Sequence, residues 1–374
     1  MRSYFLAKAA VAAGHSVTVV TGGGDRYCIE SIEGISIHRL PVQYSNYFGF
    51  WKRIFSFARF VMLCAVHAHK FKQHHVCYAI STPLTIGLAA RWLKWRHNIP
   101  YIFEVGDLWP DVPIELNVIE NGLLKNLLWR LEKKNYRSAM SVVALSPAIQ
   151  SAIEKKAPGI PVHMIPNMAD TDYFQSTSKP TELEKKFNVK GKLVVAYFGA
   201  MGFANGLENL LQAIKTCKEL PVHFLFAGDG VERTNLEQLA EQLQLNNVSF
   251  LGFQTRESIR ELMQVTDVVL VSFRPAKILE TGSPNKLFDG LAAGKLIAIN
   301  FSGWLREVIE SSSCGLYVDP SQPDALAHAL KKLLGSNNLP LYQRNARALA
   351  EEKYSRQALC QQWLDVLEQK NRAQ

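Results

Sequence analysis

Short apolar runs alternate with helical patterns along the whole chain. The runs are rich in β-branched and aromatic residues and are mostly continuous, which is typical of strands buried on both faces of a parallel sheet. Strands are predicted in the first half from Val17, Ile35, Val76, Tyr101, Ser141 and Val162. Strands are predicted in the second half from Leu193, Val222, Val248, Asp267, Leu296 and Gly315. The pattern predicts an α/β protein with two Rossmann-like, doubly wound domains.

The predicted boundary between the domains is the polar stretch 169–192, which contains a proline, a Ser/Thr cluster and no strand pattern of its own. We assign 1–180 to an N-terminal domain and 181–350 to a C-terminal domain. The segment 351–374 is predicted to be a helix that packs back toward the N-terminal domain. The chain opens on a helical pattern, whereas a βα unit ordinarily opens on a strand and a turn. We therefore expect the first strand of the N-terminal sheet to be missing, through either an upstream start or a truncation.

Composition is that of an ordinary globular protein, with 374 residues, 48% hydrophobic and 20% charged, which suits two domains. The 42 basic and 33 acidic side chains give a net charge of +9, which favours an anionic partner such as nucleotide, lipid phosphate or nucleic acid. Six scattered cysteines without C-x-x-C spacing indicate reduced thiols in a cytoplasmic protein, not a disulfide frame or a zinc site. The opening helix does not have the pattern of a signal peptide. The longest apolar stretch, Ile54–Val66, contains Arg59 and is shorter than the ~20 residues of a membrane-spanning helix.

The stretch "GSPNKLFDGLAAGK", residues 282–295, has the pattern of a helix N-terminus that holds an anion. Ser283 is a predicted N-cap, and Pro284 would occupy the first helical position, where its missing N–H costs nothing. Asn285 and Lys286 would then lie in the first turn, where free backbone N–H groups and the helix dipole attract negative charge. Lys286 adds a full positive charge.

Asp289 follows Lys286 by three positions and is predicted to share its helix face. Its carboxylate could accept hydrogen bonds from a ribose diol while phosphates lie on the cap. Gly294 is predicted to end the helix. The alternative interpretation is a well-capped helix with a solvent-exposed lysine, and the stretch by itself does not decide between the two.

Two further turns follow predicted strands of the C-terminal domain. The first contains Gly199, Gly202 and Gly206, and the second, "FAGDGVER", contains Gly228 and Gly230. Glycine lets backbone approach a ligand closely, and ligands of open α/β sheets bind at the carboxyl ends of the strands. The G-x-G-x-x-G spacing of a dinucleotide site is absent, so each turn alone could also be a plain tight turn.

Together these segments resemble the GT-B glycosyltransferases of family 4, and within them the bacterial O-antigen, capsule or colanic acid type. The resemblance rests on the segments "GHSVTVVTG", "DLWPD", "VALSPAI", "IPNMADTDYF", "YFGAMGFANGLENLL", "FAGDGVER", "VSFLGF" and "SPNKLFDGLAAGK". They occur in the family's order over nearly the whole length.

The resemblance implies a GT-B fold and retaining transfer of a sugar from a nucleotide-sugar to an acceptor hydroxyl in surface polysaccharide (lipopolysaccharide or capsule) biosynthesis. The donor, a UDP- or GDP-sugar, would bind the C-terminal domain. The acceptor, a polyprenyl-diphosphate-linked glycan, would bind the N-terminal one, with the chemistry in the cleft between them. No tightly bound metal or other cofactor is expected. The implied donor-binding residues are Gly202, Asn205, Gly228, Gly252, Phe253, Arg274, Ser283, Pro284, Asn285, Lys286 and Asp289. The implied catalytic residues are Asp107, Lys286 and Glu280.

Two features depart from the family pattern. The family has two glutamates with seven residues between them before its "AAG", whereas here Asp289 takes the second place and Glu280 lies one position off the first. The family also begins with a strand and a glycine loop that contacts the donor phosphates, and neither is found at the start of this chain.

The main electrostatic task would be to stabilise the departing diphosphate, which gains charge as the glycosidic bond breaks. Lys286, the backbone at 283–285 and the turn at Gly202 are expected to do this, with Arg274 as a further candidate that could equally be a solvated loop residue. Asp107, after the strand at 101–105, would bind the acceptor or orient its hydroxyl, or could instead be the N-cap of the next helix. A departing phosphate oxygen could itself take the acceptor proton, so a separate base is not required.

Aromatic and basic residues are mixed in the segments Asn46–His75 and Arg91–His97. Such mixtures suit a helix at an anionic bilayer surface, and we expect peripheral attachment to the inner face of the cytoplasmic membrane. The alternative is a helix that covers the sheet with its basic ends in water. Nucleic acid is not an expected partner, because no nucleic-acid-binding motif accompanies the basic residues.

Three other functions compete with sugar transfer. An N-terminally truncated, inactive remnant could act as a binding or scaffold protein. A nucleotide-sugar epimerase of the same fold is disfavoured by "DLWPD" and "SPNK". A dinucleotide oxidoreductase is disfavoured by the glycine spacing.

Overall fold

A computed structural model describes residues 2–45, 47–81 and 83–368 of the chain. Asn46, at the start of the predicted membrane patch, and residues 369–374, at the end of the predicted C-terminal helix, lie outside the described residues. Contacts divide the chain into two compact units. Unit 1 contains the chain up to Pro166, Thr281–Ser283, and the chain from Gln357 onward; unit 2 contains Asn167–Glu280 and Pro284–Arg356. The division thus falls after Pro166, whereas the sequence pattern predicted it at 180.

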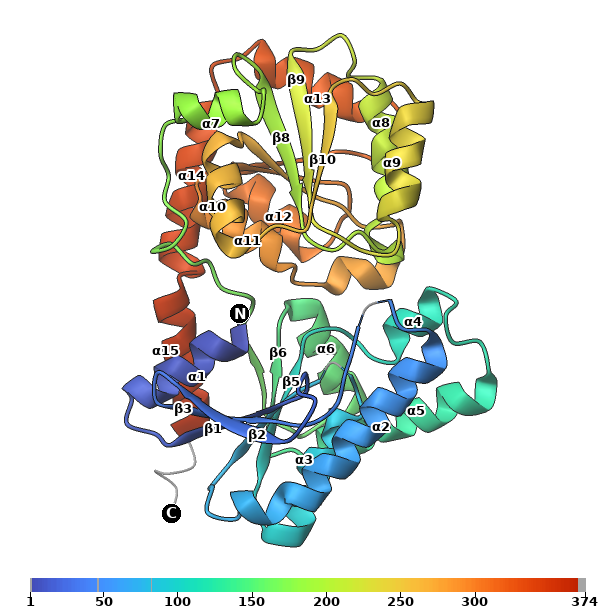
Figure 1. Cartoon of the computed structure of the whole chain (residues 1–374), viewed down its shortest axis with the longest axis vertical. Coiled ribbons are helices and arrows are strands. Elements are labelled where there is room, and N and C mark those ends of the chain that lie inside the picture. The colour runs from blue at the N-terminus through green and yellow to red at the C-terminus, as the bar shows by residue number, and fades with distance from the viewer. Residues whose placement is uncertain (1, 46, 82, 369–374) are drawn as a thin grey trace. The chain divides into compact units, whose positions relative to one another are not determined.

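Unit 1 contains two sheets with helices around them (Figure 1). The first has the order β1-β3-β2, with strands β1 (Val17–Thr21), β3 (Ile35–Arg39) and β2 (Cys28–Ile32). The second is parallel and has the order β4 (Cys77–Ile80), β5 (Tyr101–Val105), β6 (Ser141–Ala144) and β7 (Val162–Met164). The helices are α1 (Arg2–Ala12), α2 (Phe50–His67), the 3₁₀ helix η1 (Ala68–Phe71), α3 (Ile86–His97), α4 (Asp111–Glu115), α5 (Gly122–Ser138), α6 (Pro147–Lys156) and α15 (Arg356–Glu368).

Strand β2 is the one strand of the described residues that the sequence pattern missed. It pairs antiparallel with β3 through a tight turn at Glu33 and Gly34, whose φ angles are 49° and 80°. It lies at the edge of its sheet, and all its residues except Cys28 are exposed. An exposed edge strand needs no continuous apolar run, which is why the search for buried strands passed over it.

A buried ion pair ties the first helix of unit 1 to its parallel sheet. Arg2 Nε donates to Glu104 Oε2 at 2.9 Å, and the two side chains are 8% and 2% exposed. The same carboxylate accepts the hydroxyl proton of Tyr78, while the rest of the Arg2 guanidinium donates to the carbonyls of Ile165 and Pro166. Removing one partner would leave an uncompensated buried charge, so the pair fixes α1 against the ends of β4, β5 and β7.

The C-terminal helix α15 also packs on unit 1. The Trp363 ring meets the Tyr78 ring edge-on at 5.2 Å, and the Cys360 thiol donates to the Phe5 carbonyl at 3.8 Å. His15 and Glu368 meet at 3.0 Å near the end of the helix. These contacts account for its apolar spacing.

Unit 2 is built on one six-stranded parallel sheet (Figure 1). Its order is β10 (Val248–Gly252), β9 (Val222–Ala227), β8 (Leu193–Phe198), β11 (Val268–Val271), β12 (Leu296–Ile299) and β13 (Gly315–Tyr317). The helices are α7 (Thr181–Lys186), η2 (Phe203–Asn205), α8 (Leu207–Lys215), α9 (Arg233–Gln242), α10 (Arg256–Val265), η3 (Lys277–Thr281), α11 (Asn285–Ala292), α12 (Trp304–Ser311), α13 (Ala325–Leu334) and α14 (Leu339–Lys353). This is the doubly wound order, and its topological switch point lies between β8 and β11.

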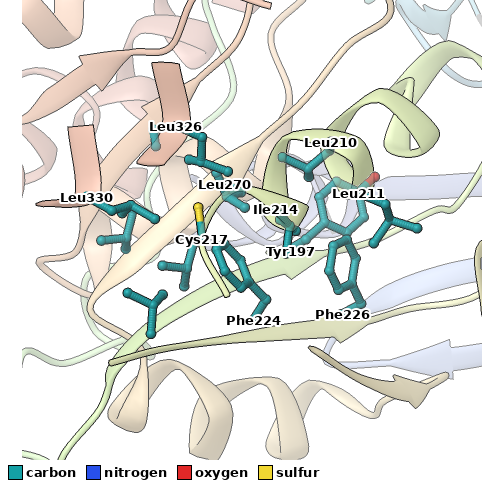
Figure 2. Packing of buried hydrophobic residues seen from close by; sticks show 14 of the residues in the cluster. Tyr197, Leu210, Leu211, Ile214, Cys217, Phe224, Phe226, Leu270, Leu326 and Leu330 are labelled. Carbon is teal, nitrogen blue, oxygen red and sulfur yellow. The ribbon is translucent and has the colours of Figure 1, made fainter. Parts of the chain in front are cut away.

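One face of this sheet is covered by α8, α9 and α13. Figure 2 shows the cluster, in which Tyr197, Phe224 and Phe226 of the strands pack under Leu211 and Ile214 of α8. All five side chains are at most 1% exposed. Strands β8, β9, β11 and β12 are buried along their full length, which explains why they form unbroken apolar runs in the sequence.

Helix α11 packs on the other face, against β11 and β12, and Gly290 sets how closely it approaches. A Cβ atom built at Gly290 would lie 2.8 Å from Ile297 Cδ1 and 3.1 Å from Val269 Cβ. At its end the Gly294 and Lys295 amides donate to the carbonyls of Leu291 and Gly290. Gly294 has a φ of 62°, so the helix ends in a Schellman motif and the prediction for Gly294 is confirmed.

We expect Gly290→Val to destabilise unit 2 by about 1–3 kcal/mol, because the added atoms overpack the contact with β11 and β12. Urea unfolding followed by circular dichroism measures this. Gly122→Val is the control, since a Cβ there meets no atom within 4 Å. Equal stability of the two variants would show that α11 can move away from the sheet at no cost.

Candidate active site

The two predicted glycine turns of unit 2 pack directly against each other at the carboxyl ends of β8 and β9. The amides of Gly199 and Met201 donate to the carbonyls of Ala227 and Asp229, each at 2.9 Å. A Cβ at Gly228 would lie 1.8 Å from the Gly199 oxygen. Glycine is therefore required at 228 by the close approach of the two backbones, and together the turns form one rigid wall.

The rest of the β8–α8 turn is tied to the end of β11. Ser272 Oγ donates to the Asn205 carbonyl at 2.8 Å, and the Asn205 side-chain amide donates to the Gly202 carbonyl at 3.4 Å. Gly206 has a φ of 57°, and a Cβ there would lie 2.9 Å from the Arg274 Cα. These contacts fix the turn after β8 to the loop after β11, across the switch point between the two strands.

Arg274 is engaged within this turn. Its guanidinium lies 3.7 Å from the centre of the Phe203 ring, donates to the Phe203 carbonyl at 3.1 Å and pairs with Glu208. Arg274 thus stabilises the β8–α8 turn. The alternative interpretation, in which it is a solvated loop residue, does not hold. Its guanidinium charge is already shared with Glu208.

Helix α11 begins one residue later than predicted. Pro284, with a ψ of 128°, is the N-cap, and Asn285 is the first helical residue. Ser283, which is 8% exposed, precedes this N-cap, and Pro284 itself makes no side-chain cap hydrogen bond. The predicted N-cap at Ser283 is therefore wrong, because the extended ψ of Pro284 starts the helix after the proline. The first-turn N–H groups of Asn285 and Lys286 still have no partner within the helix.

Lys286 extends from this first turn toward β8. Its Nζ lies 3.7 Å from the centre of the Tyr197 ring, and 3.5 Å from the position of a Cβ at Gly199. The side chain is partly buried, and desolvation lowers the pKa of Lys286 to about 7. Among the residues that the structure describes, no carboxylate forms an ion pair with it. Lys286 therefore favours a negative ligand beside Gly199.

Asp289 lies one turn further along α11, in a different environment. Desolvation raises its pKa to about 7, the nearby charge of Arg256 lowers it and that of Asp170 raises it further. Asp170 is 3% exposed and pairs with both Arg256 and Arg356, the latter at 2.6 Å. Asp289 thus faces a buried ionic cluster to which Lys286 does not belong, and its binding to ribose remains a prediction.

The other predicted donor residues lie in loops that follow strands of the same sheet. Gly252, with a φ of 66°, ends β10, and its carbonyl accepts the Gly228 amide at 2.8 Å. Phe253 follows and is 76% exposed. Glu280 lies in the 3₁₀ helix η3, and a Cβ at Gly303 would lie 2.8 Å from its carbonyl oxygen.

Asp107 belongs to unit 1, in the turn after β5, and its side chain is exposed. Helix α4 begins at Asp111 with Pro110 as its N-cap, so the alternative that Asp107 caps this helix is wrong. Asp111 accepts from the Trp129 indole at 2.7 Å and from Lys156, which makes the second acid of "DLWPD" a structural residue.

Sequence reasoning missed Tyr197, under Lys286, and the cluster of Asp170, Arg256 and Arg356. Tyr197 and Asp170 each lay within a motif quoted for the family resemblance, but neither was given a role. No motif or pattern in the sequence around Arg256 indicated a role for it. In the described ranges, no group of three or more His, Cys, Asp or Glu side chains is arranged to hold a metal.

We expect Asp289→Asn to stabilise the protein increasingly as the pH rises. Folding raises the pKa of Asp289 from 3.8 to about 7, so the protonated form is favoured in the folded state. Stability therefore falls as the pH rises above about 4, and the loss is complete once the pH has passed about 7. Melting temperatures at about pH 5 and about pH 8 should show a small gain and a larger one, respectively. The exposed Asp324→Asn should show no such trend. A loss of stability at the higher pH would mean that Arg256 keeps the carboxylate ionised.

Two family models together match most of this chain. Residues 2–168 match the glycosyl transferase 4-like domain, and residues 178–350 match glycosyl transferases group 1. The two matches correspond to the N- and C-terminal halves that the strand pattern separated.

Known proteins agree with these matches. An uncharacterized glycosyltransferase of Methanocaldococcus jannaschii is 24% identical, over 96% of this chain and 91% of its own. A putative colanic acid biosynthesis glycosyl transferase of Escherichia coli, WcaI, is also 24% identical, over 66% of this chain and 61% of its own. The crystal structure of Anabaena HepE with UDP and glucose has a TM-score of 0.74 at 18% identity, covering 98% of this chain and 95% of that one. The two Rossmann-like folds and the family matches agree: this chain belongs to the GT-B glycosyltransferases of family 4.

Proposed function

We propose that this glycosyltransferase moves a sugar, with retention of anomeric configuration, from a nucleotide-sugar to a lipid-linked glycan. The observation that carries the proposal is the position of Lys286. Its cation has no carboxylate partner among the described residues, and it lies at the first turn of α11 beside the backbone of Gly199. A helix N-terminus and a glycine turn, two features that bind phosphate in other proteins, thus lie next to the same lysine.

The diphosphate would lie between the α11 N-terminus and the β8–α8 turn. As the bond from the sugar C1 to phosphate breaks, negative charge grows on the leaving diphosphate oxygen. Lys286 and the free N–H groups of the first turn would stabilise that charge from fixed positions, which is the most effective form of electrostatic catalysis. The α11–sheet contact at Gly290 and the hydrogen bonds of the turn keep these donors in place before the substrate arrives.

Retention follows if the acceptor hydroxyl attacks C1 from the face that the diphosphate leaves. The C1–O bond to phosphate breaks, a C1–O bond to the acceptor forms, and the hydroxyl proton passes to the departing phosphate oxygen. This balance requires no separate base. Asp107 of unit 1 would bind the acceptor or orient its hydroxyl, and Glu280 would face the donor sugar.

A uridine diphosphate sugar is the first donor to test, and a guanosine diphosphate sugar the second. Similarity to HepE, whose structure holds UDP and glucose, supports this order. The exposed Phe253 and the backbone at Gly252 would meet the base, and Asp289 would bind the ribose. Backbone contacts of that kind carry no readable code for the base. We expect no tightly bound cofactor.

Similarity to WcaI, named for colanic acid biosynthesis, supports a role in surface polysaccharide synthesis. The growing glycan in such a pathway would be carried on a polyprenyl diphosphate, which makes the acceptor both anionic and lipid-linked. The basic character of the chain suits an acceptor of this kind.

We expect purified protein to hydrolyse one of the UDP-, GDP- or ADP-sugars slowly, and Lys286→Ala to reduce that rate about 100-fold or more, the loss typical of removing one transition-state donor. Lys277→Ala is the control, because Lys277 is an exposed lysine at the start of η3, the element before α11. Near-normal hydrolysis by Lys286→Ala would refute the site. Tight nucleotide binding with no turnover of any sugar would instead favour the binding-protein alternative.

We also expect nucleotide diphosphate binding to take up protons at about pH 8.5, where a lysine of pKa about 7 is mostly neutral and a diphosphate beside it restores its charge. Titration calorimetry of UDP in two buffers of different ionisation enthalpy measures the uptake. Lys286→Met should abolish it. Binding without proton uptake would place the diphosphate away from Lys286.

A further inference from the structure

The positive charge of the chain is concentrated in one stretch of unit 1. Residues 34–103 contain nine Lys or Arg side chains and no Asp or Glu. The whole chain has 42 basic and 33 acidic side chains, so the remainder has 33 of each and no net charge. The entire net charge of +9 is therefore carried by this stretch, which contains α2 and α3 and ends within β5.

Helix α2 presents an apolar stripe to solvent within this stretch. Trp51, Phe55, Met62 and Val66 are 77%, 65%, 58% and 59% exposed. Their spacing of four, seven and four residues places them on one helix face. A surface helix of a globular protein normally has polar residues on its solvent side. Helix α2 has apolar residues there instead.

The neighbouring helices continue the exposed apolar surface. On α3, which packs against α2, Leu88, Trp92 and Trp95 follow one face and are 38%, 40% and 73% exposed. On α5, which packs against α3, Leu123 and Leu127 are 83% and 62% exposed. We call the exposed apolar side chains of α2, α3 and α5 the unit 1 apolar surface.

Basic side chains lie among these apolar ones. A hollow of about 250 Å³ adjoins α2, and it is lined by Phe48, Lys52, Phe55, Ser56 and Arg59 among others. Lys52 Nζ lies 4.0 Å from the centre of the Phe48 ring. Ammonium and guanidinium groups beside aromatic rings suit the phosphate of a lipid headgroup at the level where its acyl chains begin.

The geometry of α2 favours lying in a membrane surface over crossing the membrane. The segment Trp51–Phe71 is long and apolar enough to span, and 22% of it is buried within the protein. However, it contains Arg59 at its centre, α2 is packed against α3, and Ser56 donates to the Gln43 carbonyl at 2.9 Å. Spanning would break these contacts and carry Arg59 into hydrocarbon. The alternative interpretation, a helix that merely covers the sheet, does not account for the exposed stripe.

We infer that the unit 1 apolar surface, with its basic side chains, binds an anionic phospholipid bilayer as an in-plane, peripheral surface. The exposed side chains of α2, α3 and α5 would enter the interface, while Lys52, Arg53, Arg59 and the bases of α3 meet lipid phosphates. This inference goes beyond the proposed function, because it rests on exposure and charge in unit 1 and uses no step of sugar transfer. Such binding would hold the protein at the anionic inner face of the cytoplasmic membrane.

Sedimentation of the full chain with vesicles tests the inference. We expect binding to phosphatidylcholine vesicles with about 30% phosphatidylglycerol, weak binding to pure phosphatidylcholine, and loss of binding as salt rises. Phe55→Ser/Met62→Ser should weaken binding about tenfold by removing apolar side chains from the interface. Leu334→Ser/Leu341→Ser is the matched control, because these apolar residues of unit 2 are 39% and 47% exposed.

The electrostatic contribution to vesicle binding is tested separately with Lys52→Glu/Arg59→Glu. This variant should lower affinity for anionic vesicles about tenfold or more and leave binding to neutral vesicles unchanged. Unchanged circular dichroism and unchanged UDP binding in unit 2 would show that the variants are folded. Equal binding of all variants, or no binding to anionic vesicles, would overturn the inference. So would a dimer, detected by light scattering, that Phe55→Ser/Met62→Ser dissociates, since the surface would then bind a second copy.

Discussion

The packing of α11 on β11 and β12 is the constraint on which the proposed donor site of this glycosyltransferase depends. Gly290 allows the helix backbone to approach the sheet, and the Schellman motif at Gly294 ends the helix before β12. This fixes the first turn of α11 at the switch point, where Lys286 reaches Gly199 and Tyr197. Even a small displacement of the helix would separate its free N–H groups from the β8–α8 turn. The helix N-terminus and the turn could then no longer bind the same anion.

Both ionisable side chains of α11 are held in environments that disfavour their charged forms. Desolvation brings the pKa of Lys286 down to about 7 and the pKa of Asp289 up to about 7. Neither arrangement stabilises the folded chain at neutral pH. Side chains with pKa values shifted in this way are typical of functional sites. A bound ligand there supplies the opposite charge, and the protein without ligand is less stable than it could be. Here a diphosphate would neutralise Lys286, whereas Asp289 is already adjacent to Arg256.

The two units divide their chemistry by charge. Unit 2 places Lys286 beside Gly199 and the Tyr197 ring, while the net positive charge of the whole chain lies in residues 34–103 of unit 1. A charge confined in this way attracts an extended anionic surface more strongly than the same charge spread over the protein. The proposed transfer of sugar from a water-soluble donor to a lipid-linked acceptor would use both kinds of site.

Much of the fold could be predicted from the sequence because buried parallel strands require continuous apolar runs, and those runs locate every described strand except β2. The glycine turns and the presence of helix α11, though not its first residue, were also predictable, since their local backbone geometry restricts which residues fit. Local pattern could not reveal the exposed edge strand β2, the shift of the N-cap to Pro284, or the Glu208 partner of Arg274. Nor could it place Asp170 beside Arg256, 86 residues away in the chain. Those features depend on contacts between distant segments, and only the tertiary structure determines which segments meet.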